Sequence, residues 1–126
     1  MRLDTDALRV QVEATLAARI PVLAVIGVLG TTEFGTIDPV HEILDVREAC
    51  RRNGHDFGIH VDGAWGGYLT AMFRKPDGGF RDRAELRESF RHFPTESVYG
   101  AFRGLSEVDS ITVDPHKMGY VPYSAG

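Results

Sequence analysis

The stretch Val22-Leu23-Ala24-Val25-Ile26-Gly27-Val28 decides the fold of this chain. It contains no polar side chain, and three of its residues are valine and one is isoleucine, which favour β-structure. A short run that is apolar on both faces is typical of a central strand in a parallel sheet. We therefore predict a buried strand at residues 22–28 and interpret the neighbouring segments from it.

The segments that follow this strand predict a β-α-β unit. Residues 30–36 predict a loop, and Asp38-Pro39 predicts a helix start with Asp38 as the capping side chain and Pro39 in the first turn. The helix should run to about Asn53, and residues 59–62 predict a second strand. Such crossovers are nearly always right-handed and build parallel sheets with helices on their faces. The fold class predicted is therefore α/β.

Four further elements are predicted outside this unit. Residues 4–19 predict a helix, because apolar residues recur there at four-residue spacing. Residues 74–94 look the least ordered, with a turn-rich insertion and then a charged, solvent-exposed helix. Residues 95–104 predict another helix, and residues 110–114 predict a third strand. Ligands of parallel sheets bind at the carboxyl ends of strands, so a site is expected where these strands end.

Composition limits the class of protein. The chain has 126 residues, one domain's worth or less, and a formal net charge of -4 that argues against nucleic-acid binding. No apolar run approaches the roughly 20 residues of a membrane span. The N-terminus has no apolar signal core, so a cytoplasmic protein is expected. The single cysteine, Cys50, is expected to be buried in a helix.

Two motifs resemble metal or nucleotide sites but lack an essential residue. His41-Glu42-Ile43-Leu44-Asp45 has the start of a zinc-protease helix motif, but Asp45 replaces its second histidine, so solvent-facing helix residues are the better interpretation. Residues 30–36 have P-loop glycine spacing without the lysine that reaches phosphates. The five histidines show no metal-ligand spacing. We predict no metal site.

Asp62 and Lys117 remain as candidates for chemistry, since each lies at the carboxyl end of a predicted strand. They could form a simple ion pair or be unrelated surface groups. Three features favour a joint role: small residues after Asp62 would let a flat group approach the backbone, Asp114-Pro115 would fix the direction of Lys117, and both ends belong to the edge where such sheets bind ligands.

A carboxylate and a lysine in this arrangement suit pyridoxal 5'-phosphate (PLP). The lysine amine forms a Schiff base with the cofactor aldehyde. The carboxylate pairs with the pyridine nitrogen and keeps it protonated, so that the ring can accept electrons from the substrate. His116 could contact the cofactor phosphate or control the proton balance beside Lys117.

At these residues the chain resembles the group II PLP-dependent amino-acid decarboxylases, which have the aspartate-aminotransferase-like fold (fold type I). The matching pieces are Gly30-Thr31-Thr32 with Asp38, then residues 60–64, and finally residues 109–117. The similarity is greatest to the bacterial tyrosine decarboxylases and the archaeal tyrosine/aspartate decarboxylases, in which the lysine motif continues as in residues 118–126. Each piece alone is weak, but the ordered set is specific and covers nearly the whole chain.

The resemblance implies a role for each of six residues. These are Lys117 as the Schiff-base lysine, Asp62 as the partner of the pyridine nitrogen, Ala64 on the ring face, Thr32 near the ring, His116 beside the cofactor near its phosphate, and Tyr123 as a substrate contact. For Tyr123, simple packing is an equally good interpretation. Gly63 and Trp65 depart from the family pattern, where alanine and an aromatic of another type are usual. The long gap between Asp62 and Lys117 favours the bacterial tyrosine-type branch.

The resemblance also implies a setting and a reaction. Residues 1–126 are expected to be part of a PLP-binding large domain, with a phosphate loop upstream, a small domain downstream and a homodimeric parent protein. The expected reaction is decarboxylation of an L-amino acid, tyrosine or another aromatic one. The alternatives are another fold-type-I PLP enzyme (a glutamate or aspartate decarboxylase, another lyase or an aminotransferase) and an inactive fragment that does not bind PLP by itself.

Overall fold

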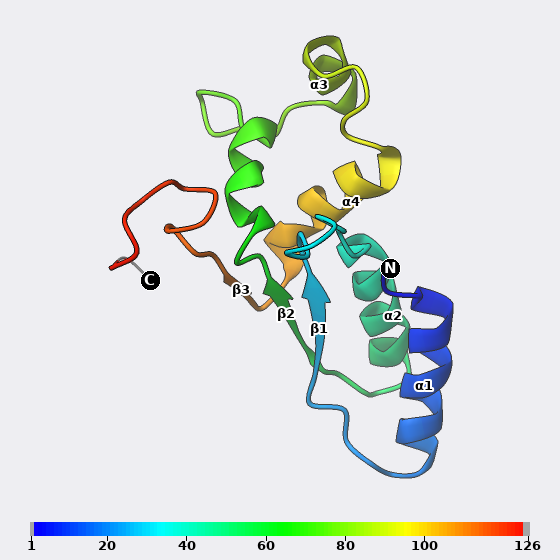
Figure 1. The fold of residues 1–126 in the computed structure, drawn as a ribbon. Helices are drawn as coiled ribbons and strands as arrows, with labels where there is room; N and C mark the ends of the chain where they lie inside the picture. Colours follow the sequence, from blue (N-terminus) through cyan, green and yellow to red (C-terminus); the bar gives the residue numbers. More distant parts are fainter. Residues whose placement is uncertain (1, 125–126) are drawn as a thin grey trace.

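The three predicted strands form one parallel sheet in the computed structural model of the protein, which describes residues 2–124 (Figure 1). The strands are β1 (Ala24–Val28), β2 (Gly58–Asp62) and β3 (Ser110–Thr112), in the order β1-β2-β3. The register pairs Asp62 with Val28 on one side and with Thr112 on the other. The strands therefore end level with one another, which confirms the parallel α/β architecture and places their following loops at one edge.

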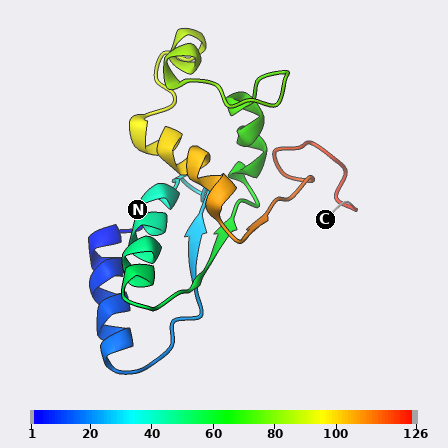
Figure 2. The ribbon, with the colours of Figure 1, turned by 180° about the vertical axis from the view of Figure 1, so that it is seen from behind.

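The predicted helices are confirmed, with ends that differ by a few residues. They are α1 (Thr5–Ala17), α2 (Val40–Arg52), α3 (Arg83–Ser89) and α4 (Glu96–Gly104), and two 3₁₀ helices, η1 (Gly66–Phe73) and η2 (Leu105–Glu107), complete the fold. The helices α1 and α2 lie side by side, as Figures 1 and 2 both show. The helix η1 was not predicted, because its glycine-rich start carries no capping signal.

Only one face of the sheet is covered by the described residues, so the expected two-sided burial of β1 is wrong. Val25 and Gly27 point toward α2, and a Cβ on Gly27 would lie 3.0 Å from Cδ1 of Ile43. Ile26 points the other way and is 61% exposed. The apolar run therefore predicted the strand correctly, but the prediction that both of its faces are buried does not hold within the described residues.

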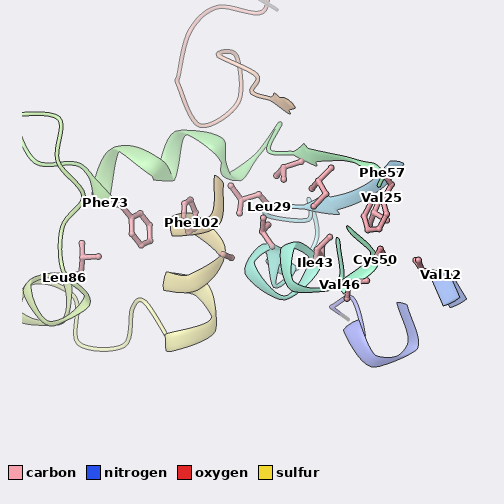
Figure 3. Packing of buried hydrophobic residues seen from close by; sticks show 14 residues of the cluster. Val12, Val25, Leu29, Ile43, Val46, Cys50, Phe57, Phe73, Leu86 and Phe102 are labelled. Carbon is pink, nitrogen blue, oxygen red and sulfur yellow. The ribbon is translucent and has the colours of Figure 1, made fainter. Parts of the chain in front are cut away.

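The core has two connected parts (Figure 3). The first lies between α2 and the sheet and includes Ile43 and Ile59, and Cys50 is buried in it as expected. The second is aromatic: the rings of Phe73 and Phe102 stack at 4.2 Å between centroids. Its further members come from the segment that looked least ordered, since Phe80, Leu86 and Phe93 all pack into the core. Residues 74–94 therefore include a packed part of the core, contrary to the expectation.

Two polar residues around α2 also differ from expectation. Asp38 does not cap the helix; its carboxylate accepts hydrogen bonds from the backbone N–H groups of Leu3 (2.7 Å) and Val28 (2.8 Å). It thereby ties the N-terminal segment to the end of β1, because a buried carboxylate needs such donors. His41 does not point simply into solvent. A Cβ on Gly100 would lie 2.9 Å from its Nδ1, so the imidazole packs closely on α4.

Candidate active site

Asp62 is the last residue of the central strand β2, and its side chain is exposed. Its Oδ1 accepts a hydrogen bond of 3.1 Å from the backbone N–H of Ala64. Within residues 2–124, no hydrogen bond or ion pair reaches its Oδ2. The strand therefore presents a carboxylate that is oriented by the following loop and keeps one oxygen for another donor.

The loop after β1 is held closed by Thr31 and contains Thr32 on its exposed turn. The hydroxyl of Thr31 accepts from the backbone N–H of Thr36 at 3.0 Å, and the N–H groups of Gly30 and Thr31 both donate to the Thr36 carbonyl. Gly30 and Gly35 have φ of 96° and 60°, values that glycine adopts readily. Thr32 lies after β1, the strand beside β2, which ends at Asp62. No bond joins the side chains of Thr32 and Asp62 among the described residues.

The glycines after Asp62 serve the packing of the chain on itself. A Cβ on Gly63 would lie 2.9 Å from the Thr112 carbonyl oxygen, and one on Gly67 would lie 2.7 Å from Cγ2 of Val113. A Cβ on Gly66 would overlap the carbonyl oxygen of Leu29, to which the Gly66 N–H donates at 2.9 Å. These glycines let β3 and the loop after β1 approach, and the expectation that the small residues also leave room for a flat ligand stays a prediction.

Lys117 lies in a turn after β3, where its backbone N–H donates to the carbonyl of Asp114 at 3.2 Å. Its Nζ lies 2.7 Å from Oδ2 of Asp114 and 5.9 Å from the ring centroid of Trp65. The Lys117 ammonium holds the pKa of the Asp114 carboxyl below its usual value. No bond between Lys117 and Asp62 is present in the described part of the chain. Instead, Trp65 connects the lysine to the loop that begins at Asp62.

His116 and Tyr123 lie together. Their ring centroids are 4.6 Å apart, and Nε2 of His116 is 3.8 Å from the same Asp114 oxygen that pairs with Lys117. The side chain of Tyr123 is 87% exposed. Three of the predicted site residues thus share one short segment, in which Asp114 lies near Lys117 and His116 and Tyr123 lies near His116.

Sequence reasoning missed two residues of this arrangement, Asp114 and Trp65. Asp114 precedes Lys117 by three residues, and side chains at this spacing come into contact when the chain forms a turn. Its role could therefore have been predicted from the sequence. The position of Trp65 against Lys117 depends on how β3 lies beside β2 and has no local signal. The residues 2–124 contain no cluster of three or more His, Cys, Asp or Glu side chains suited to a metal ion. None of their helices is both long and apolar enough to span a membrane.

Comparison with known proteins places this arrangement in a family. Residues 1–98 match the pyridoxal-dependent decarboxylase conserved domain. The chain is 44% identical to L-tyrosine decarboxylase of Enterococcus faecium, over 99% of this chain and 22% of that protein. It is 39% identical to a probable L-tyrosine/L-aspartate decarboxylase of Methanothermobacter thermautotrophicus, over 82% of this chain and 22% of that protein. The chain thus spans about a fifth of the length of these relatives.

Solved structures agree with the sequence matches. Catharanthus roseus tryptophan decarboxylase in complex with L-tryptophan superposes with a TM-score of 0.56 at 30% identity, covering 91% of this chain and 19% of that one. Mouse CSAD in its apo form gives a TM-score of 0.64 at 25% identity, covering 98% and 20%. These matches confirm the fold class. The family match confirms the pyridoxal-type cofactor that the sequence predicts. The chain belongs to the pyridoxal-dependent decarboxylase family.

Proposed function

We propose that the protein carrying this chain is a PLP-dependent carboxy-lyase that acts on an L-amino acid, tyrosine or another aromatic one. The observation that carries the proposal is the placement of Asp62 and of the Lys117 turn after neighbouring parallel strands, in a chain of the pyridoxal-dependent decarboxylase family. The amino-acid substrate is a small molecule, in keeping with a site at a sheet edge.

The residues present fit the cofactor. A protonated pyridine nitrogen needs a carboxylate oxygen that is not already engaged, and Oδ2 of Asp62 meets this requirement within residues 2–124. The covalent link needs a primary amine near that carboxylate, and Lys117 lies against Trp65 of the adjoining loop. When bound, PLP supplies an electron sink for the electrons left by a broken bond at the substrate α-carbon.

The chain's own residues would then divide the work. Lys117 binds the cofactor covalently and Asp62 holds the proton on its ring nitrogen. Ala64 and Thr32 position the ring, while His116 lies beside the cofactor near its phosphate. Tyr123 packs on His116 and is a candidate proton-donating contact to the substrate. These roles are the ones that the family resemblance implies for these residues.

The choice of substrate is supported by the gradient of similarity. Three L-tyrosine decarboxylases are 37–44% identical over 99% of this chain, whereas an aspartate 1-decarboxylase of Aliivibrio fischeri is 34% identical over the same share. The archaeal tyrosine/aspartate relatives, at 38–39%, keep aspartate as the second candidate. Other reactions of fold-type-I PLP enzymes remain the alternative reaction class.

Product analysis with the full-length protein tests the proposal. Incubation with PLP and L-tyrosine should yield tyramine and carbon dioxide, with less or no amine from L-aspartate or L-glutamate. Lys117→Arg should abolish turnover because the covalent link is lost, and Lys75→Arg should retain it. A keto acid as the product would indicate transamination, and an unimpaired Lys117→Arg protein would refute the assigned role.

The setting of the chain is part of the proposal. We place residues 1–126 within a larger PLP-binding domain, and we propose a cytoplasmic homodimer for the whole protein from the family resemblance alone. Two observations support the larger domain. The chain spans about a fifth of its relatives, and the face of β1 that carries Ile26 is exposed although parallel sheets are normally covered on both faces. The 126-residue chain alone should then bind PLP poorly. Tight, stoichiometric PLP binding by this chain would contradict that placement.

A further inference from the structure

We propose that Asp114 is a positioning residue. In the cofactor-free protein its carboxylate holds the side-chain nitrogen of Lys117, and the cofactor must displace this carboxylate to reach the nitrogen. The inference rests on the proposed role of Lys117 as the residue that binds the cofactor. It concerns the state of the lysine before this bond forms.

The contact is short and is built by the local backbone. Nζ of Lys117 and Oδ2 of Asp114 are 2.7 Å apart, and the turn that joins them is closed by the hydrogen bond from the Lys117 N–H to the Asp114 carbonyl. The side chains are 27% and 23% exposed, so the pair is only partly screened by water. The turn brings the two residues close together in the backbone, and the side chain of Lys117 still loses rotamer freedom when the pair forms.

The surroundings provide no competing carboxylate for the amine within residues 2–124. Trp65 faces Nζ from the loop after β2, and its ring favours a cation. The helix η1 contributes Tyr68, whose ring lies against Gly119 of the same turn. His116 is the other titratable group near Asp114, at 3.8 Å. A carboxylate and an aromatic face therefore both contact the side-chain nitrogen of Lys117.

The ammonium form cannot react with an aldehyde. The proton must first leave to solvent; the nitrogen lone pair then bonds to the carbonyl carbon, and the carbonyl oxygen leaves as water. The 2.7 Å contact between Nζ of Lys117 and Oδ2 of Asp114 must also be broken before the nitrogen can reach the carbonyl carbon. Asp114 thus keeps the amine in place and slows its reaction with aldehydes until the cofactor takes it from the carboxylate.

The chain offers a matched control, since it contains only two lysines, Lys75 and Lys117. Nζ of Lys75 lies 3.4 Å from Oε1 of Glu85, and these side chains are 37% and 44% exposed. Each lysine therefore has one carboxylate partner, but the pair at Lys117 is shorter and less exposed. Glu85→Gln removes the charge and retains an oxygen that can complete the capping box at the start of α3.

The test is reductive methylation of the cofactor-free, full-length protein with formaldehyde and a borane reductant at fixed pH, with both lysines quantified by peptide mapping. Asp114→Asn should accelerate the methylation of Lys117 about two- to fivefold and leave Lys75 unchanged. Glu85→Gln should accelerate Lys75 by a smaller factor and leave Lys117 unchanged. Asp114→Glu should keep Lys117 close to the wild-type rate. An unchanged ratio of Lys117 to Lys75 labelling in Asp114→Asn overturns the proposal.

If the methylation of both lysines is faster in Asp114→Asn, the substitution has loosened the fold. The ion pair of Lys117 is then tested by the salt dependence of methylation in a protein that retains Asp114. In the Glu85→Gln protein, raising the salt from about 0.05 to 0.5 M should accelerate Lys117 more than Lys75, because only Lys117 retains its pair. An equal response overturns the proposal. Formaldehyde reacts with an accessible lysine amine without being bound as the cofactor would be, so the result does not depend on the proposed function. Asp114→Asn should also capture PLP faster, and failure of that result alone would count against Lys117 as the cofactor residue.

Discussion

The two ends of β3 carry ion pairs of the same length and different character. Before the strand, Nη1 of Arg47 lies 2.7 Å from Oδ2 of Asp109; after it, Lys117 lies 2.7 Å from Asp114. The Arg47 side chain is 7% exposed, and its Nη2 also donates to the Glu107 carbonyl at 2.6 Å. The Lys117 side chain is 27% exposed and has no such second acceptor in the described residues.

We infer from this difference that the pair of Arg47 and Asp109 stabilises the fold, whereas the pair of Lys117 and Asp114 can be broken without unfolding the chain. Oδ2 of Asp109 also accepts from the Ile59 N–H at 2.7 Å, so the first pair joins α2, β2 and the start of β3. It thereby helps to set the register in which Thr112 lies beside Asp62. The second pair joins residues of a single turn. The first should therefore govern stability and the second the reactivity of the lysine.

Gly66→Ala should have the largest effect on stability, because Gly66 is where the segment after β2 packs against the backbone of Leu29. The new methyl group would overlap the Leu29 carbonyl oxygen, and a backbone atom cannot rotate away. We expect the free energy of unfolding to fall by about 3 kcal/mol in urea titrations. Gly58→Ala is the control, since its Cβ would meet nothing closer than 3.6 Å and should cost less than about 1 kcal/mol. Equal costs would contradict the close approach at Gly66.

Arg47→Ala should come next, since it removes a buried partner from three elements at once. The remaining Asp109 side chain is 55% exposed and can be solvated, so the loss should be below that of a fully buried pair. We expect the free energy of unfolding to fall by roughly 2 kcal/mol, measured by urea titration. A change within error would mean that the pair does not build the fold.

The pH dependence of stability should identify the same pair. Hydrogen bonding from the Ile59 N–H, with the nearby Arg47 charge, holds the pKa of Asp109 below its usual value. On acidification the unfolded carboxyl takes up its proton first, so the stabilisation is complete above about pH 4 and is lost as the pH falls through the folded pKa. Urea midpoints between pH 6 and 3 should therefore fall more steeply for the wild type than for Asp109→Asn. Parallel curves would contradict this.

Asp114→Asn should have the smallest effect on stability. The pair lies within one turn and is partly exposed, so we expect no measurable change in the urea midpoint at pH 7. The same variant should change the methylation of Lys117. A loss of stability as large as that of Arg47→Ala would show that the two pairs do not differ as proposed.

The apolar periodicity and the turn residues were enough to predict the strands, the main helices and the place of Asp62 at the end of β2. The third strand ends at Thr112, two residues before the predicted end, so Lys117 lies in the turn that follows. These local signals were not enough where long-range contacts decide. Asp38 bonds to Leu3 and Val28 instead of capping α2, because burial made those donors available. The stretch around Leu86 is rich in charged residues, and its apolar residues have no regular spacing. Their packing into the aromatic core therefore could not be predicted from a local pattern. Likewise, the role of Gly66 depends on the position of Leu29, which no local pattern encodes.

We propose that Lys117 binds the cofactor covalently. The most direct test is borohydride reduction of the full-length protein in the presence of PLP, followed by digestion and peptide mapping. We predict that the reduced pyridoxyl group is found on Lys117 and that Lys75 is unmodified. Modification of Lys75 alone, or of neither lysine in a protein that holds PLP, would contradict this role of Lys117.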